Sequence, residues 1–410
     1  MQRYSGHCLI VERSIVNFGF RVCLNTGGKM EQIHIATASD DRYAQHAGVM
    51  MASLLENAAS PQAIRFHIVD AGIEEVNRGR LKRLAERYGA GCRFIPYQFR
   101  DVEIFVSRHI NAVSYIRLHL SELLDESIDK VLYLDCDIVV NKDISKLWEY
   151  ELGDFFLAAV DNTDLGRNLS IGIPVDAKYF NAGVLLIDLR KWRNASVTSL
   201  FNAVLIELKD QLKYHDQDVL NKVLYDKWLI LKPIWNVRKG FYSMHEKNSV
   251  YSRHELDEAI RDPAVIHYTE ASKPWHYLNH HPRKADYYRY LHLTEWKDFV
   301  PPEKGKIDDL LKTRKIVLFG IGHVGKQLLD RLMQLKAKVS YIVDNDPGKW
   351  NTFYLDIPIY VPDRLRDEDK QSVFVFIASM YYEEIGKQLE QMGFVENLHF
   401  CAYGFEHRLV

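Results

Sequence analysis

Two spacings of apolar residues succeed one another along the chain, and they predict alternating strands and helices. Short apolar runs at residues 33–39, 65–70 and 92–97 have the length and composition of buried strands. Between them, residues 45–57 and 77–88 carry apolar side chains three or four positions apart, which predicts helices with one buried face. This order indicates an α/β protein with a mostly parallel sheet, whose ligand site lies at the carboxyl ends of the strands.

The pattern continues through the middle of the chain. Apolar runs at 130–140, 155–161 and 180–189 predict three more strands, and the spacing in 216–228 predicts another helix. The first of these runs differs from the others because acidic residues interrupt it. A ligand-binding or metal-binding site is therefore expected at that strand.

Asp135 and Asp137 are the interrupting acids. Side chains two positions apart on a strand point the same way, so both carboxylates can reach one cation while Cys136 faces away. Adjacent carboxylates repel unless a cation neutralises them, which favours Mg²⁺ or Mn²⁺ bridging the phosphates of a nucleotide. Asp-x-Asp occurs four times in the chain, so the apolar run in front of this copy carries the prediction.

The first predicted strand also ends in polar residues. A nucleotide base could stack on Tyr43 and hydrogen-bond to the carboxylate of Asp40. Aspartate is equally a good helix N-cap, so Asp40 taken alone favours a cap. Combined with the Asp135 strand, the pattern favours a base site.

Composition limits the choice of function. The 410 residues are 47% hydrophobic, and 53 basic and 55 acidic residues give a net charge of −2, so nothing global attracts nucleic acid. Five cysteines without a CxxC pair argue against a disulfide framework and a zinc site, and they fit a reducing cytoplasm. No apolar run reaches the length of a membrane span.

Seven segments resemble, in order, the successive blocks of glycosyltransferase family 8, and in particular the bacterial lipopolysaccharide α-galactosyl- and α-glucosyltransferases. They are residues 38–43, 65–72, 114–118, 130–137, 179–187, 216–221 and 267–275. Seven ordered blocks across about residues 31–280 are far more specific than one motif.

The resemblance implies a GT-A fold and a Mn²⁺-dependent (or Mg²⁺-dependent), retaining transfer of a hexose from a UDP-sugar. The acceptor would be an oligosaccharide or lipopolysaccharide, which implies a cytoplasmic enzyme and leaves peripheral association with the inner face of the membrane open. Matching blocks imply that the metal ligands are Asp135, Asp137 and His267. They also imply that Asp40 and Tyr43 contact the uracil, that Lys273 contacts the diphosphate and that Asp161 lies near the acceptor. The residues implied around the donor sugar are Arg117, Asn181, Ala182, Gly183, Asp216 and Gln217.

Retention of configuration needs either a nucleophile on the far face of the sugar or a front-side attack guided by the leaving phosphate. Gln217 is a poor nucleophile, which favours front-side attack, and Asp216 is the covalent alternative. The chain departs from the family at Glu270, where close relatives carry glycine beside the diphosphate. A negative charge beside the diphosphate is unfavourable, so the affinity of the chain for its UDP-sugar donor remains open.

The C-terminal part has a pattern of its own. A strand at 315–319 leads into Gly320, Gly322 and Gly325, spaced as GxGxxG, and Asp344 ends the next strand 19 residues after Gly325. This is the dinucleotide fingerprint, with glycines for close phosphate approach and an acid for a ribose. It resembles small Rossmann-like modules beside sugar-modifying enzymes. Binding of a nucleotide or NAD, docking and dimerisation all remain open.

These patterns divide the chain into four parts. We expect an N-terminal extension at 1–29, with Met30 as a candidate natural start, and a transferase domain at 30–297. A linker at 298–312 and a Rossmann-like domain at 313–410 follow. The alternative function is an oxidoreductase or sensor that acts through the glycine-rich domain. The sequence leaves the choice of UDP-sugar and the oligomeric state open.

Overall fold

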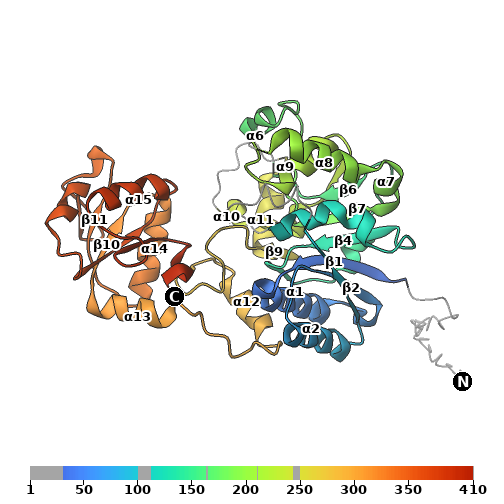
Figure 1. Ribbon diagram of the computed structural model, residues 1–410, viewed down its shortest axis with the longest axis horizontal. Helices are drawn as coiled ribbons and strands as arrows, with labels where there is room; N and C mark the ends of the chain where they lie inside the picture. Colours follow the sequence, from blue (N-terminus) through green and yellow to red (C-terminus); the bar gives the residue numbers. More distant parts are fainter. Residues whose placement is uncertain (1–30, 100–111, 163–164, 210, 243–249, 410) are drawn as a thin grey trace, which may run out of the picture. The chain divides into compact units, whose positions relative to one another are not determined.

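The computed structural model describes residues 31–99, 112–162, 165–209, 211–242 and 250–409 (Figure 1). The predicted extension at 1–29 and the candidate start at Met30 lie outside these ranges. Residues 32–410 form one compact unit, which contains two large sheets with their own helices.

The first sheet has seven strands in the order β3-β2-β1-β4-β7-β6-β8. Its strands are β1 (Ile33–Ser39), β2 (Ile64–Asp70), β3 (Gly91–Pro96), β4 (Lys130–Leu134), β6 (Leu157–Ala159), β7 (Val184–Asp188) and β8 (Trp228–Ile230). Four of its six pairings are parallel, and only those that β7 makes with β4 and β6 are antiparallel. The predicted mostly parallel α/β sheet is confirmed.

Helices pack on this sheet and on one another, and α1 is buried along most of its length. In α1, every residue from Val49 to Met51 and both Leu54 and Leu55 are buried. The described helices of this part are α1 (Ala44–Asn57), α2 (Glu75–Arg87), α4 (Leu120–Leu123), α5 (Ser145–Trp148), α6 (Leu165–Ser170), α7 (Leu189–Asn194), α8 (Val197–Leu208), α9 (Asp216–Leu224), α10 (Lys239–Tyr242), α11 (Arg253–Arg261) and α12 (Lys284–Leu291).

The apolar run 130–140 forms two strands rather than the predicted one. β4 ends at Leu134, and β5 (Ile138–Val140) leaves the large sheet to pair antiparallel with β9 (Val265–His267). The two acids lie in the break between these strands. Carboxylates cannot continue a strand that is buried on both faces without a charge partner, so the chain changes sheet where they occur.

The C-terminal sheet has six strands in the order β12-β13-β11-β10-β14-β15, and only the β12–β13 pairing is antiparallel. The strands are β10 (Lys315–Phe319), β11 (Val339–Val343), β12 (Thr352–Tyr354), β13 (Ile357–Tyr360), β14 (Val373–Ile377) and β15 (Phe400–Ala402), accompanied by α13 (Lys304–Thr313), α14 (His323–Gln334) and α15 (Tyr382–Gln391). Helix α14 follows the glycines, and it buries Leu328, Leu329 and Leu332.

Part of the predicted linker at 298–312 is a helix. Ile307 and Leu310 of α13 are buried in the same apolar cluster as Leu318 of β10 and Leu328 of α14. An amphipathic helix this close to a sheet packs on it, because its apolar face gains more from burial than from exposure to water. We therefore define the C-terminal module as residues 304–409.

A buried ion pair fixes the first turn of α9. Arg167 and Asp218 bond through both carboxylate oxygens, and Asp218 is fully buried. The same carboxylate accepts the backbone N–H groups of Lys213 and Tyr214 and the hydroxyl of Tyr179. This Asp-x-Asp copy, formed with Asp216, therefore includes one acid that is structural.

Asp218→Ala should lower the free energy of unfolding by about 3–5 kcal/mol, because it leaves the guanidinium of Arg167 buried without its partner. Chemical denaturation followed by circular dichroism measures the change. Asp226→Ala is the matched control, since that acid is exposed and its nearest cation is 3.9 Å away, so a shift below about 0.5 kcal/mol is expected. Equal shifts in the two variants would contradict the assigned role of the ion pair.

Candidate functional site

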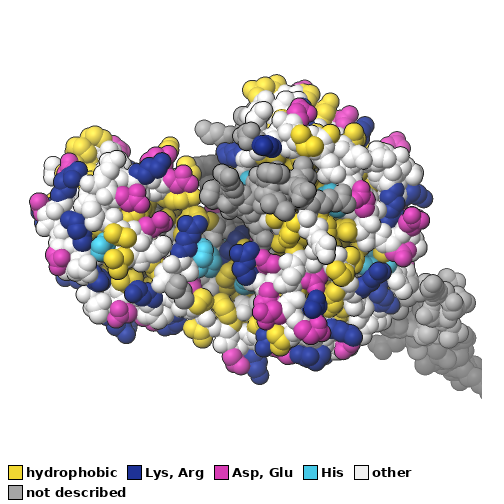
Figure 2. Space-filling view, viewed as in Figure 1, with side chains coloured by type: hydrophobic (Ala, Val, Ile, Leu, Met, Phe, Trp, Pro, Cys, Tyr) yellow, Lys and Arg dark blue, Asp and Glu magenta, His cyan; other side chains and the backbone are white. Residues whose placement is uncertain are grey.

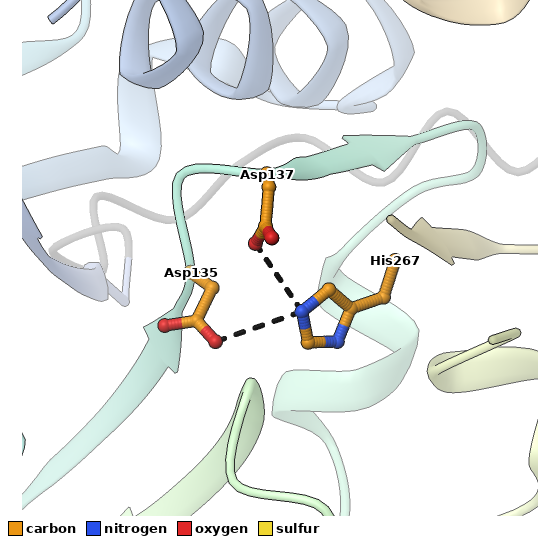
Figure 3. Close-up of side chains that lie close together, drawn as sticks. All are labelled: Asp135, Asp137 and His267. Carbon is orange, nitrogen blue, oxygen red and sulfur yellow. Dashed lines mark ion pairs between the residues drawn. The ribbon is translucent and has the colours of Figure 1, made fainter. Parts of the chain in front are cut away.

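Three side chains from the ends of three strands converge beside the break after β4 (Figure 3). Asp135 follows β4, Asp137 precedes β5, and His267 is the last residue of β9. The β5–β9 register sets Ile138 opposite His267, which brings the imidazole next to the acids. Its Nε2 lies 3.2 Å from Asp137 Oδ1 and 3.6 Å from Asp135 Oδ2.

These three groups can hold one divalent cation. Their ligand atoms all lie within 4.8 Å of one another, and carboxylate oxygens with one imidazole nitrogen suit a first-row ion such as Mn²⁺. The donor set therefore fits the metal that the resemblance implies. The structure brings these three residues together, and their role as metal ligands remains a prediction.

Gly183 makes the close approach of these ligands possible. A Cβ at this position would overlap the His267 ring and lie 2.7 Å from Asp135 Oδ2. Its neighbour Ala182 accepts a hydrogen bond from Arg117 through its carbonyl oxygen, at 2.5 Å. Both residues lie beside the cluster, and their predicted contact with the donor sugar remains a prediction.

Asn236 orients the imidazole, and sequence reasoning missed it. Its Oδ1 lies 3.0 Å from His267 Nδ1, which fixes Nε2 toward the acids. The Nδ2 of Asn236 donates to Asn181 Oδ1 at 2.8 Å, and Asn181 Nδ2 donates to Gln217 Oε1 at 3.0 Å. The sequence signal is weak: one amide between the apolar neighbours Trp235 and Val237.

Gln217 lies in the first turn of α9, and its amide is held on both sides. Oε1 accepts from Asn181 and from the backbone N–H of Ala182, and Nε2 donates to the hydroxyl of Tyr179 at 3.2 Å. Such a fixed amide can present a dipole to a ligand without reorganising.

Arg117 links the predicted metal ligands to the predicted catalytic acid. Its Nη2 lies 2.8 Å from Asp135 Oδ1, and its Nε lies 2.9 Å from Asp216 Oδ2. Burial raises the pKa of Asp216 to about 6, against the opposing effect of Arg117 and with a further increase from Asp135. Asp216 therefore changes charge near neutral pH.

Lys273 supplies a second positive charge. Its Nζ lies 2.7 Å from Asp137 Oδ2 and donates to the carbonyl oxygen of Tyr268 at 2.6 Å. Although burial opposes ionisation of Asp137, Lys273 and His267 hold its pKa below the usual range. The site thus combines two carboxylates with cations on either side.

A cavity of about 170 Å³ opens onto this cluster. Its lining residues come from the ends of β1 and β4 and from the 3₁₀ helix Ala112–His119: Ala38, Tyr43, Val113, Ser114, Arg117, Tyr133, Asp135, Cys136 and Asp137. Tyr43 lies edge-on to Trp275, with ring centroids 6.0 Å apart. An aromatic wall beside the acids is a suitable surface for a base.

Two other predicted residues have local bonding roles. Asp40 caps the 3₁₀ helix Asp41–Tyr43 by accepting the Tyr43 N–H, and it pairs with Arg42 at 2.7 Å. Asp161 is 3% exposed, and its backbone N–H and carbonyl oxygen bond to Tyr251 and Arg238. Their predicted contacts with uracil and acceptor remain predictions.

Glu270 has a cationic partner. Its Oε2 lies 2.5 Å from Nζ of Lys239, whose side chain is 15% exposed. This ion pair offsets the negative charge of Glu270.

The glycine-rich turn of the C-terminal module borders a separate cavity of about 630 Å³. Gly320 has φ +98°, and a Cβ on Gly325 would overlap the Gly320 carbonyl oxygen, whereas Gly322 faces open space. Asp344 also lines the cavity, but its oxygens already accept from the Ile321 and Asp346 N–H groups and from Lys349. The glycines occupy their predicted places, and the acid is already bonded.

The charge distribution offers no further site on the face shown in Figure 2. There, basic and acidic side chains are interspersed over the described surface. Among the residues that the structure describes, no helix is long and apolar enough to cross a membrane.

Comparison with known proteins gives two family matches. Residues 34–279 match the family model described as Glycosyl transferase family 8, and residues 312–398 match a model described as C2185-like, N-terminal. General stress protein A of Bacillus subtilis (strain 168) is 33% identical over 280 residues, covering 67% of this chain and 98% of that protein. Lipopolysaccharide 1,2-glucosyltransferase of Escherichia coli is 29% identical over 284 residues, covering 67% and 82%.

Solved structures agree with this match. The galactosyltransferase LgtC, crystallised with donor and acceptor sugar analogs, is 31% identical, with a TM-score of 0.56, and covers 67% of this chain and 99% of that one. The glycosyltransferase GlyE of Streptococcus pneumoniae TIGR4 covers 91% of both chains at a TM-score of 0.50 and 19% identity, which shows a shared fold alone.

Asn236→Ala should weaken Mn²⁺ binding by about tenfold or more, because His267 loses the acceptor that orients it. Calorimetry or electron paramagnetic resonance of added Mn²⁺ measures the affinity. Asn236→Asp retains an acceptor oxygen and should bind Mn²⁺ more tightly than the alanine variant. Wild-type affinity in Asn236→Ala would remove the orienting role.

Proposed function

The chain belongs to glycosyl transferase family 8, and we propose that it transfers a hexose, galactose or glucose, from a UDP-sugar to a glycan acceptor with retention of configuration. Family membership makes it a glycosyltransferase with a GT-A fold. The observation that carries the finer proposal is the convergence of Asp135, Asp137 and His267 beside Lys273.

A divalent cation, Mn²⁺ or Mg²⁺, is the proposed cofactor. Asp135, Asp137 and His267 would hold it, and when bound it neutralises negative charge on the departing nucleoside diphosphate. Lys273 lies next to Asp137 and adds a fixed positive charge for the same diphosphate. Both charges act in a site where burial strengthens them.

Donor recognition is proposed for the surrounding cavity. Tyr43 and Asp40 would contact the uracil, with Tyr43 as the stacking surface. Arg117, Asn181, Ala182 and Gly183 would lie along the diphosphate and sugar. Support comes from the cavity lining, which includes Tyr43 and Arg117, and from the hydrogen bonds that link Asn181 to Gln217.

We propose front-side attack as the route to retention. Asp216 is a poor candidate for a covalent nucleophile, because its Oδ2 pairs with Arg117 and the side chain is buried. Gln217 is held by three hydrogen bonds and can orient a sugar hydroxyl or the leaving phosphate. In this assignment Asp216 holds Arg117, and Gln217 contacts the donor.

The acceptor proposed is a growing oligosaccharide or lipopolysaccharide, with Asp161 on its side of the site. Support comes from the Escherichia coli relative, a lipopolysaccharide 1,2-glucosyltransferase. Such an acceptor would place the enzyme in the cytoplasm, at the inner face of the membrane.

The C-terminal cavity is a candidate second ligand site rather than the seat of the main activity. Family membership favours the transferase over an oxidoreductase or sensor. We propose a nucleotide or NAD at Gly320, Gly322 and Gly325, supported by the cavity of about 630 Å³ that they border. The existing bonds of Asp344 would have to rearrange before it could bind a ribose.

Asp137→Ala should reduce metal-dependent UDP-sugar hydrolysis by about 100-fold or more, because it removes a cation ligand and the partner of Lys273. The assay compares UDP-glucose and UDP-galactose with and without Mn²⁺, with circular dichroism to verify folding. Asp367→Ala, in an exposed Asp-x-Asp copy, should keep wild-type rates. Full activity of Asp137→Ala would refute the metal assignment.

The rate should fall about tenfold per pH unit below pH 6. The pKa of Asp216 is about 6, so its carboxylate is present above that pH and is protonated below it, when Arg117 loses a charge partner. A pH profile of kcat/KM measures this fall in rate at acidic pH. Asp216→Asn should be less active at every pH and should not show the fall. The same fall in that variant as in the wild type would assign the titration to another group.

A further inference from the structure

The loop at residues 268–283 joins β9 to α12 and carries Lys273; we refer to it as the Lys273 loop. It contains turns and bends but no helix or strand. Irregular backbone has no hydrogen-bond ladder of its own, so the position of Lys273 depends on what the loop packs against.

The loop contributes a core side chain to the C-terminal module. Leu278 is fully buried and belongs to the same apolar cluster as Ile307 of α13, Leu318 of β10 and Leu328 of α14. It lies five residues after Lys273 in the sequence. The loop is thus anchored at Leu278 in a hydrophobic core that does not belong to the transferase sheet.

Tyr277 adds two polar attachments to the same module and a third to Glu303, the residue directly before the module. Its backbone N–H donates to Glu303 Oε1 at 2.8 Å, and its carbonyl oxygen accepts from Arg331 Nη2 at 3.1 Å. Its hydroxyl donates to Asp308 at 2.7 Å. Side chains of Glu303, before α13, and of Arg331, on α14, therefore satisfy backbone groups of this irregular loop, and Asp308 of α13 holds the Tyr277 hydroxyl.

The chain after β15 holds the other side of the loop. The Tyr403 hydroxyl and His280 Nδ1 are hydrogen-bonded. Gly404, at φ +95°, approaches Ser272 so closely that a Cβ would lie 3.2 Å from the Ser272 nitrogen. Ser272 directly precedes Lys273, so the module contacts the loop next to the residue that faces the diphosphate.

We propose that the C-terminal module is a positioning element of the transfer site, which fixes the Lys273 loop so that the ammonium of Lys273 meets a nucleoside diphosphate. This inference rests on the proposed function of Lys273. Arg331 and Tyr403 are its positioning residues, because they act on the loop and not on the ligand.

Such a role predicts a specific kinetic signature. Loosening the loop should weaken binding of the diphosphate and raise the donor KM more than it lowers kcat. Metal affinity measured without nucleotide should change less than UDP affinity, because Asp135, Asp137 and His267 lie outside the Lys273 loop and only Asp137 pairs with it, through Lys273. A general loss of stability would neither raise the donor KM more than it lowers kcat nor spare the metal affinity.

The test uses the full chain and four variants. Arg331→Met removes the bond to the Tyr277 carbonyl, Arg331→Lys restores a donor, and Tyr403→Phe removes the bond to His280. Arg314→Met is the matched control, since Arg314 is also half-buried and donates to a backbone carbonyl, that of Lys370, within the module. Calorimetry measures UDP binding in saturating Mn²⁺, and steady-state kinetics give the donor KM.

Arg331→Met and Tyr403→Phe should each weaken UDP binding about threefold to tenfold, the effect of one lost hydrogen bond. Arg331→Lys should recover part of the loss, and Arg314→Met should bind like the wild type. Wild-type affinity in Arg331→Met and Tyr403→Phe, or an equal loss in Arg314→Met, would overturn the positioning role and leave the transferase intact. A wild-type chain that binds no UDP with Mn²⁺ would overturn both proposals.

Discussion

The mutual repulsion of two carboxylates is the constraint around which the site is built. Asp135 and Asp137 offer oxygens within 4.8 Å of one another, a separation at which two unit charges repel by about 3–4 kcal/mol at an effective dielectric constant of about 20. Two cations offset this repulsion: Arg117 pairs with Asp135, and Lys273 pairs with Asp137. The change of sheet between β4 and β5, the orientation of His267 and the small residue at 183 all follow from keeping these charges together.

Much of the transferase part could be predicted from the sequence, because its signals are local. Apolar runs identified β1, β2 and β3, and helical spacing identified α1 and α2 to within two residues. The acids were recognised as a pair because they interrupt an apolar run two positions apart, although the structure places them between β4 and β5 and not on one strand. Ordered family blocks then supplied His267 and Lys273, which are distant from the acids in sequence and carry no motif of their own.

What escaped prediction depends on long-range pairing. The break between β4 and β5 follows from the β5–β9 register, which joins residues more than 120 positions apart. Asn236 becomes functional only because that pairing places it behind His267. Residues 298–312 were predicted to be a linker because they contain Pro301 and Pro302 and the apolar spacing of α13 is short; contact with β10 and α14 shows that α13 belongs to a core.

The overlap that any side chain at position 183 would cause shows how little room the cluster leaves. In this chain a single methyl group there would meet the His267 ring and the Asp135 carboxylate, so one of them would have to shift. The cluster would then be opened by a residue that is neither acidic nor a histidine, while every acid and the histidine remained in the sequence.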